Sequence, residues 1–225
     1  MTCFRAALPI CASLLLVTAA LDARADAPGE PWKLRLDRDG VQVYTSEVEG
    51  SPYDAVLSRT IVHDMRLSAL AAVILDAEAC PRWADRCAES WVYEELSATE
   101  ALVYTLNDLP FPVKDRDVLA HVRWQQDEES GAVLMRSEAT TDILPDNRRI
   151  QRLENAATTW EFIPGADGSI EVLNWAHIDP GSNLPAWITN MLLIDTPFET
   201  MKALVAEARK TNYAEAEVGF IVEPP

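Results

Sequence analysis

The sequence lacks the short motifs that carry the common catalytic chemistries. It contains no HExxH zinc motif, no GxSxG nucleophile elbow, no CxxC redox pair and no glycine-rich phosphate loop. Its three histidines, His63, His121 and His177, lie on separate predicted strands or strand ends, without a second ligand type at metal spacing. Carboxylates are plentiful, but they sit in runs such as Glu94-Glu95, which are typical of solvated faces. We therefore predict no catalytic residues, no metal site and no cofactor.

Basic residues are scarce as well. The chain has 19 lysines and arginines against 36 aspartates and glutamates, a formal net charge of −17. Such a surface repels phosphate backbones and anionic bilayers at long range. The charge argues against a nucleic-acid partner and against static adsorption to an acidic membrane, and its simplest role is solubility.

Residues 1–25 predict a signal peptide. Arg5 supplies a positive start, Ala6–Ala20 is apolar, and Ala23-Arg24-Ala25 matches a small-x-small cleavage site. The apolar run is shorter than the roughly 20 residues that a membrane span needs. Cys11 follows Ile10, where lipid attachment would require a small residue. We therefore expect export to the periplasm or beyond, after cleavage near Ala25.

The mature chain would begin at Asp26, a length that suits one domain with a sizeable core. Two of the 19 basic residues and one of the 36 acidic residues belong to the leader, so the mature chain carries a formal charge of −18. We predict a single domain over residues 26–213 and a C-terminal tail over 214–225. The oligomeric state is not predicted.

Only Cys80 and Cys87 remain after cleavage. In an exported protein such a pair is more often a disulfide than a metal site. On one straight helix their Cα atoms would be about 10 Å apart, too far to bridge. Pro81 is expected to break the helix there, so we predict a disulfide between the two cysteines.

Short β-branched or aromatic-rich runs, separated by charged, glycine or proline turns, predict a long antiparallel sheet with hairpin connections. Val41–Thr45 alternates apolar and polar residues after the Asp39-Gly40 turn, and Ala55–Val62 is its predicted partner. A short helix is expected before them near Trp32–Leu36, and an amphipathic helix after them over Leu67–Ala79. The other predicted strands are Glu89–Leu96, Ala101–Leu106, Asp117–Trp124, Ala132–Thr140, Ile150–Leu153, Thr158–Ile163 and Ile170–Ile178.

The C-terminal region predicts one helix from Pro185 to about Thr211, on the order of 40 Å long. Thr196-Pro197-Phe198-Glu199 resembles a capping box with proline at the first helical position, so we expect a kink or brief break near Asp195. The apolar residues of this helix step by four and three in one stripe: Trp187, Met191, Ile194, Phe198, Met201, Val205 and Ala208.

This order of elements predicts an α+β fold. The stripe must be buried, and the concave face of the twisted sheet is the only surface large enough to cover it. A sheet curled around one helix leaves space for an apolar ligand. The stripe is equally compatible with a helix packed on a solid core.

Two segments carry a family resemblance. Pro110–Asp117, PFPVKDRD, resembles the PFP-x-x-x-RD start of a central strand in START domains, the lipid-transfer family related to the steroidogenic acute regulatory protein. Asp179–Asn190, DPGSNLPAWITN, is similar to their DPGG-x-IP-x-W-L-x-N run, with Ser182 and Leu184 as departures. Weaker matches are Trp32–Tyr44 and Arg152 with Trp160–Pro164. The resemblance spans Pro31 to Lys210 and is to START domains of the phosphatidylcholine transfer protein type.

The resemblance implies a helix-grip fold, in which a curved antiparallel sheet and a long last helix enclose a tunnel. It also implies one hydrophobic ligand, such as a sterol, a fatty acyl chain or a phospholipid. Several members have a second arginine six residues after that of the RD pair, where this chain has Val122. Arg123 is next, and alternation places it on the opposite face. We therefore do not carry over recognition of a phospholipid headgroup.

Candidate ligand contacts follow from this layout. For Arg116 and Asp117 we favour an ion pair or backbone clamp that fixes the start of the strand, and for Trp187 and Asn190 we favour helix docking and capping. The loop Pro180–Asn183 is expected to open together with the helix. The tunnel candidates are Arg116, Asp117, Arg152, Asn174, Trp187, Met191, Ile194 and Phe198.

The leading interpretation is an exported lipid-binding or lipid-transfer protein that makes transient contact with membranes and does not bind nucleic acid. Two alternatives stay open. One is a cyclase- or aromatase-like enzyme on the same scaffold, since related helix-grip proteins include such enzymes. The other is an envelope interaction module with a packed interior and no ligand.

Overall fold

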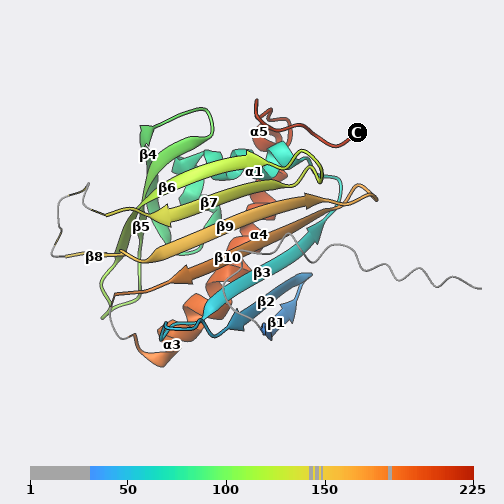
Figure 1. Cartoon of the computed structure of the whole chain (residues 1–225). Helices are drawn as coiled ribbons and strands as arrows, with labels where there is room; N and C mark the ends of the chain where they lie inside the picture. The colour runs from blue at the N-terminus through green and yellow to red at the C-terminus, as the bar shows by residue number, and fades with distance from the viewer. Residues whose placement is uncertain (1–30, 142–143, 145–146, 148, 182–183) are drawn as a thin grey trace, which may run out of the picture.

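A twisted sheet of ten strands carries helices on one of its faces (Figure 1). The structure is a computed structural model that describes residues 31–141, 144, 147, 149–181 and 184–225. The predicted signal peptide lies outside these residues. Within them, no helix has both the length and the apolar character needed to cross a membrane. The α+β helix-grip architecture expected from the sequence is confirmed.

The strands pair in the order β1-β2-β3-β10-β9-β7-β6-β5-β4, and the short β8 pairs in parallel with β6. Every other pairing is antiparallel. The strands are β1 (Lys33–Arg38), β2 (Val41–Ser46), β3 (Ala55–Val62), β4 (Cys87–Glu95), β5 (Glu100–Asn107), β6 (Arg116–Gln126), β7 (Val133–Ala139), β8 (Gln151–Arg152), β9 (Ala156–Pro164) and β10 (Ile170–Ile178).

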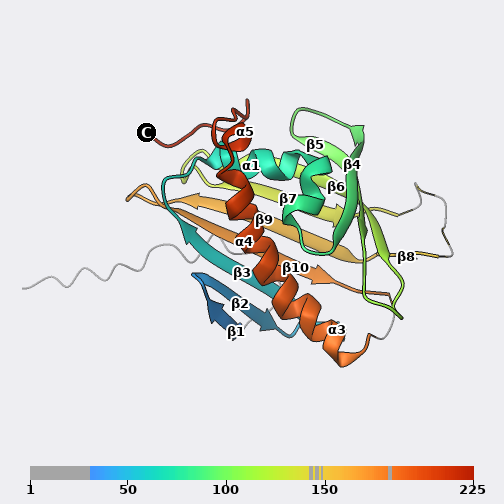
Figure 2. The same ribbon diagram turned by 180° about the vertical axis from the view of Figure 1, so that it is seen from behind.

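The helices lie on the concave face of the sheet. Figure 2 shows α3 and α4 crossing this face diagonally, with α1 beside α4 and with β4 and β5 curling toward the helices. The helical elements are α1 (Leu67–Leu75), the 3₁₀ turn η2 (Ala77–Ala79), α2 (Cys80–Trp83), α3 (Ala186–Asn190), the π-helical stretch η3 (Met191–Asp195), α4 (Thr196–Ala208) and α5 (Thr211–Ala214).

The helix expected near Trp32–Leu36 is wrong, because strand β1 occupies these positions. Asp39 and Gly40 both have positive φ, 53° and 77°, which is the geometry of the two-residue turn that joins hairpin strands. That turn places Arg38 opposite Val41, and β1 pairs along β2. A segment of this length is too short to show its own periodicity, so strand pairing decides its structure.

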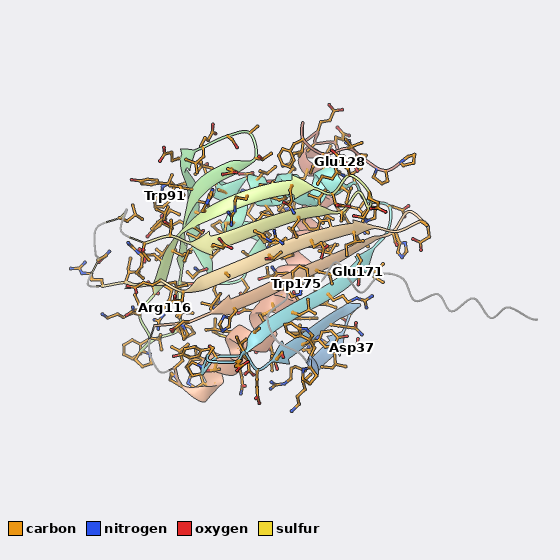
Figure 3. The ribbon with its side chains drawn as sticks, in the orientation of Figure 1. Asp37, Trp91, Arg116, Glu128, Glu171 and Trp175 are labelled. Carbon is orange, nitrogen blue, oxygen red and sulfur yellow. A yellow bond between two sulfur atoms is a disulfide. The ribbon has the colours of Figure 1, made fainter. Side chains whose placement is uncertain are left out.

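Strands β3 and β10 have the predicted bounds and pair with each other. Side-chain alternation directs Val172, Asn174 and Ala176 to the concave face. Leu173 and Trp175 point to the convex face, where Trp175 is visible in Figure 3. The polar Asn174 therefore lies on the side of the sheet that the helices cover.

The helix predicted over Leu67–Ala79 ends at Leu75, and the chain continues through η2 into α2. Pro81 sits in the first turn of α2. Its missing N–H leaves no bond unmade there, since first-turn N–H groups have no intrahelical acceptor. The proline thus starts a new short helix, which brings Cys80 and Cys87 together.

The break predicted near Asp195 is a π-helical stretch, η3, within a helix that runs on from α3 into α4. Pro197 follows it in the first turn of α4. Because proline has no N–H, the carbonyl of Leu193 loses its α-helical partner. A wider helical turn before the proline is one way to accommodate that loss.

Residues 214–225, the predicted C-terminal tail, contact the rest of the chain. Phe220 contacts the main core and the ring of Trp124. Glu223 accepts hydrogen bonds from the backbone N–H groups of Leu67 (2.9 Å) and Ser68 (2.8 Å). The residue before α1 makes no side-chain cap of its own, so Glu223 supplies the missing acceptor.

Candidate functional site

A cavity of about 390 Å³ lies between the C-terminal helix and the concave face of the sheet. We call it the α3–α4 cavity. Leu192 and Leu193 line it from the helix, and Val56, Ala176 and Ile178 line it from strands β3 and β10. The surface of the cavity is mainly apolar. The polar residues at its wall are Tyr53, Asp54, Asp85, Arg86, Asn107, Arg116, Asn174, Thr189, Thr196 and Thr200.

Asn174, one of the candidate ligand contacts, lines the cavity from the sheet. Its side chain is buried, and its Nδ2 donates to the carbonyl oxygen of Thr159 (3.1 Å). A carbonyl can only accept, so this bond fixes which end of the amide is which. The oxygen Oδ1 is left as an acceptor at the cavity.

Arg116 also lines the cavity, at the first residue of β6. Figure 3 shows it at the opposite end of the sheet from Glu128. Arg116 is 4% exposed, and its guanidinium donates to the backbone carbonyls of Pro180 (3.3 Å) and Lys114. Burial lowers the pKa of Arg116. The predicted backbone clamp is present, and it ties the loop after β10 to the start of β6.

Asp117 faces the other way, because successive residues of a strand point to opposite faces. It accepts from Nε (2.9 Å) and Nη2 (2.7 Å) of Arg152, and the hydroxyl of Tyr104 donates to it (3.3 Å). Burial, reinforced by the charge of Asp117, raises the pKa of Tyr104 to about 12. Asp117 and Arg152 thus form a structural pair with each other, away from both the α3–α4 cavity and Arg116.

The helix residues predicted to line the tunnel do not line this cavity. Phe198 is buried between the helix and the β1–β2 hairpin, where the guanidinium of Arg38 lies 4.2 Å from its ring centre. Trp187 is 53% exposed. Met191 and Ile194 are partly buried beside the cavity. The residues that do line it from this helix are Thr189, Leu192, Leu193, Thr196, Pro197 and Thr200.

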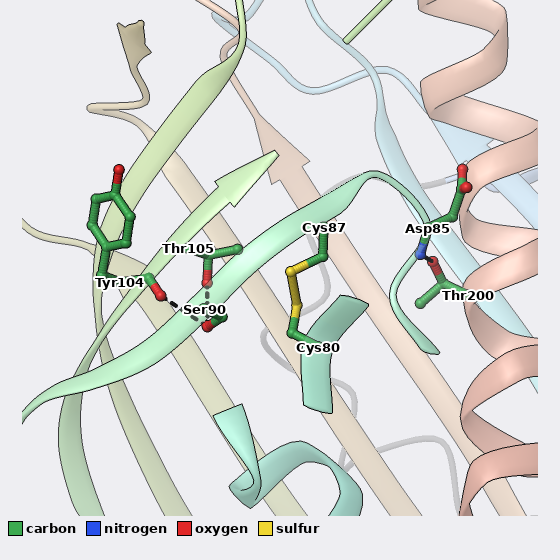
Figure 4. The surroundings of a disulfide bond; sticks show 7 residues. All are labelled: Cys80, Asp85, Cys87, Ser90, Tyr104, Thr105 and Thr200. Carbon is green, nitrogen blue, oxygen red and sulfur yellow. Dashed lines mark hydrogen bonds between the residues drawn. A yellow bond between two sulfur atoms is a disulfide. The ribbon is translucent and has the colours of Figure 1, made fainter. Parts of the chain in front are cut away.

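The predicted disulfide between Cys80 and Cys87 is present, with Cα atoms 6.0 Å apart (Figure 4). Inside the loop that it closes, Asp85 is bonded to the C-terminal helix. Its N–H donates to the hydroxyl of Thr200 (3.0 Å), and its carboxylate accepts from the hydroxyl of Thr196 (2.8 Å). The predicted capping box at Thr196 is therefore wrong, because the Thr196 hydroxyl bonds Asp85 instead of its own backbone.

A second cavity of about 390 Å³ lies under α1 and α2, against strands β4 to β7. The disulfide loop stands between the two spaces: Cys80 and Trp83 line the second cavity, whereas Asp85 and Arg86 line the α3–α4 cavity. The described residues thus line two neighbouring cavities between the helices and the sheet.

Val122 and Arg123 take the predicted faces. Val122 lines the second cavity. Arg123 lies on the opposite face of β6, where its guanidinium pairs with Glu138 (2.7 Å). The register of β6 with β5 and β7 is continuous through these residues, so no bulge returns the arginine to the interior. The interior face at this position is apolar.

The histidines on the central strands have ordinary polar partners. His121 lies 3.0 Å from a carboxylate oxygen of Glu100, and His177 lies 3.0 Å from the hydroxyl of Ser51. In the part of the chain that the structure describes, no group of three or more histidine, cysteine, aspartate or glutamate side chains is placed to hold a metal ion.

Comparison with known proteins agrees with this architecture. A family model described as START domain matches residues 17–212. An uncharacterized protein of Pseudomonas aeruginosa is 31% identical over 196 residues, which are 87% of this chain and 96% of that protein. Bovine phosphatidylcholine transfer protein is 22% identical over 166 residues, covering 72% of this chain and 76% of that protein.

Solved structures show the same fold. The crystal structure of a STAR-related lipid transfer protein from Xanthomonas axonopodis superimposes with a TM-score of 0.71 at 31% identity, over 80% of this chain and 99% of that one. Human STARD10 superimposes with a TM-score of 0.69 at 22% identity, over 80% of this chain and 74% of that one. By family model, sequence relatives and fold together, the chain belongs to the START domain family.

Proposed function

We propose that the protein is an exported lipid carrier that holds one hydrophobic molecule in the α3–α4 cavity. The observation that carries the proposal is the aliphatic cavity between the C-terminal helix and the sheet. Its volume falls within the range of ligand pockets. Membership of a lipid-transfer family supports the same reading.

The apolar wall accounts for useful affinity without a charged contact. Each buried CH₂ group contributes about 0.8 kcal/mol. About ten such groups give about 8 kcal/mol, which corresponds to a Kd near 1 μM. The cations at the cavity are engaged within the protein, since Arg116 bonds backbone carbonyls and Arg86 pairs with Asp85 (3.1 Å). This favours a ligand without a strongly charged headgroup.

Loading requires the first part of the helix to move, because Phe198, Met201 and Leu204 fix the rest of α4 in the core. Polar contacts hold the part that lines the cavity. Asp85 bonds Thr196 and Thr200, and Arg116 bonds the carbonyl of Pro180 just before the helix. We infer that η3 is the point of flexing, because a π-helical stretch has weaker regular hydrogen bonding than the α-helix around it. Release of the Asp85 bonds would then open the cavity.

Two exposed aromatic residues flank the cavity and fit a transient contact with a bilayer. Phe111 is 92% exposed and Trp187 is 53% exposed. Leu109, two residues before Phe111, and Leu184, three residues before Trp187, line the cavity. Aromatic side chains favour the interface between water and hydrocarbon, so a lipid leaving the cavity here would pass directly into a membrane.

Native mass spectrometry of the purified mature protein, followed by solvent extraction, tests the proposal. We expect one extractable lipid per chain. Leu193→Trp, which fills the cavity, should abolish the lipid adduct, whereas Ile194→Trp on the next residue of the helix should retain it. A folded wild-type protein that binds none of the lipids offered would refute lipid carriage. Conversion of the lipid to a new product would favour the alternative function, a cyclase- or aromatase-like enzyme.

Export is tested separately. We expect the mass of the protein recovered from the periplasm or medium to correspond to a chain that begins at Asp26. Full-length protein confined to the cytoplasm would refute export and would leave the cavity argument intact.

A further inference from the structure

Two neighbouring polar side chains interrupt the apolar floor under the C-terminal helix. Ser58 of β3 and Asn174 of β10 are direct cross-strand partners, and such pairs lie on the same face of a sheet about 5 Å apart. Ser58 is 1% exposed and Asn174 is 8% exposed. Among the flanking residues on this face, Val56 and Val172 are apolar and buried, and the buried Thr60 donates its hydroxyl to the carbonyl of Gly40 (2.9 Å).

Each side chain has one polar atom without a hydrogen-bond partner among the residues that the structure describes. The hydroxyl oxygen of Ser58 is buried and has no hydrogen-bond partner. Asn174 uses Nδ2 on the carbonyl of Thr159, and its Oδ1 has no hydrogen-bond partner among the residues that the structure describes. Buried polar groups are nearly always hydrogen-bonded in folded proteins. Asn174 lines the α3–α4 cavity, and Ser58 lies next to it on the same face of the sheet, behind the lining residues. The open acceptor of Asn174 and the unsatisfied hydroxyl of Ser58 beside it therefore indicate that a ligand supplies the missing partners.

We propose that Ser58 and Asn174 recognise a hydroxyl group on an uncharged lipid held in the α3–α4 cavity. This inference rests on the proposed function and narrows its ligand class. Asn174 Oδ1 can only accept and the Ser58 hydroxyl can donate, so together they match a group that does both. An alcohol does so. An ether or ester satisfies Ser58 alone, and a hydrocarbon satisfies neither.

Charge at the site agrees with an uncharged ligand. Asn174 and Ser58 carry no charge, and the nearby arginines of the cavity bond protein oxygens. A carboxylate placed against Asn174 Oδ1 would set two acceptors against each other. It would also be desolvated without a dedicated cation beside this pair, which is costly.

The test uses three probes of one chain length: 1-hexadecanol, its methyl ether and hexadecane. Each is delivered from cyclodextrin, and its binding to the mature protein is measured by displacement of Nile red. For each probe the variant is compared with the wild type, so that differences in the water solubility of the probes cancel. Asn174→Leu and Ser58→Ala remove one partner each.

We expect Asn174→Leu to weaken hexadecanol binding on the order of tenfold, since one hydrogen bond of ordinary strength is lost. Its binding of hexadecane and of the ether should be unchanged or stronger. Ser58→Ala should weaken both hexadecanol and the ether. If Asn174→Leu does not fold, Ser58→Ala carries the test alone, because it removes a hydroxyl that stabilises nothing in the free protein.

Ser46→Ala is the matched control. Ser46 is a buried serine on the neighbouring strand β2, and its hydroxyl already donates to the carbonyl of Pro31 (3.1 Å). This variant should leave the binding of all three probes unchanged. Equal effects of Ser58→Ala on the alcohol and the hydrocarbon, or no effect on either, would overturn the inference while lipid carriage stands. Failure of the folded wild type to bind any of the probes would count against both.

Discussion

Removing the arginine from the Asp117–Arg152 pair should destabilise the protein strongly. The Asp117 side chain is 3% exposed and that of Arg152 is 20% exposed. In Arg152→Met the Asp117 carboxylate would stay buried, and the Tyr104 hydroxyl would still donate to it at 3.3 Å. Breaking a buried ion pair costs about 3–5 kcal/mol because one charge is left uncompensated. Since Arg152 is partly solvated, we expect about 3 kcal/mol.

The assay is thermal and urea unfolding of the mature protein. For a domain of this size, about 3 kcal/mol corresponds to a fall in Tm of about 6–12 °C. Arg123→Met is the control, because Arg123 pairs with Glu138 on the same sheet but both side chains are largely exposed. Exposed pairs contribute about 0–1 kcal/mol, so this variant should unfold close to the wild type.

A double variant separates the pair from the packing around it. Adding Asp117→Asn to Arg152→Met removes the buried charge, so at least half of the lost stability should return. If Arg152→Met unfolds within 1 kcal/mol of the wild type, or if the double variant is no more stable than Arg152→Met, the account of Asp117 as a buried, compensated charge is wrong.

Three further predictions concern other parts of the molecule. Glu223→Gln should lower the unfolding free energy by about 1 kcal/mol in urea titrations, because a charged acceptor at the start of α1 is lost, whereas Glu217→Gln should not; equal losses would contradict the capping role. Burial raises the pKa of Tyr104 to about 12, above the value near 10 of an unfolded chain. The folded state thus holds this proton more tightly, and its contribution is complete below pH 10 and lost as the pH rises from 10 to 12. Tyr104→Phe should flatten the unfolding free energy over that range, and an unchanged slope would contradict this. Thr196→Val with Thr200→Val should speed lipid exchange between vesicles several-fold, as each lost bond weakens the closed helix by about 1 kcal/mol; an unchanged or slower rate would refute the opening of the helix at Asp85.

Much of the sheet is predictable because most of its strands have a recognisable local sequence pattern. Ala55–Val62 and Ile170–Ile178 have β-branched and aromatic residues bounded by turn signals, and both were predicted with their observed bounds. Strand β1 was missed although Leu34 and Leu36 alternate with charged residues, a pattern typical of an edge strand with few apolar side chains. The two-residue turn at Asp39-Gly40 also indicates a hairpin, since it pairs β1 with β2.

The lining of the cavity from the helix could not be predicted from a regular helical wheel. The stripe holds in α4, where Phe198 and Met201 are fully buried. Before Pro197 the π-helical stretch changes the number of residues per turn, so the phase of the stripe shifts and Leu192 and Leu193 face the cavity instead of Met191 and Ile194. Pro197 indicates that the helix is irregular here, but it does not indicate how far the helical phase shifts.

The sequence is sufficient to predict that the side chains of Arg116 and Asp117 lie on opposite faces of β6. Alternation along a strand, which places Val122 and Arg123 on opposite faces, applies equally to this pair. The partner of Asp117 was not within reach, because Arg152 comes from β8, which pairs with β6 in parallel and is only two residues long. Such a contact depends on the tertiary path of the chain.

The most direct test of the central claim is to locate a bound lipid. Isotope-filtered NMR of the mature protein loaded with ¹³C-labelled 1-hexadecanol would report which methyl groups lie within about 5 Å of the chain. The account predicts contacts to Leu192, Leu193 and Ala176, which line the α3–α4 cavity. Contacts confined to exposed residues such as Val222, or none in a folded and lipid-saturated sample, would contradict it.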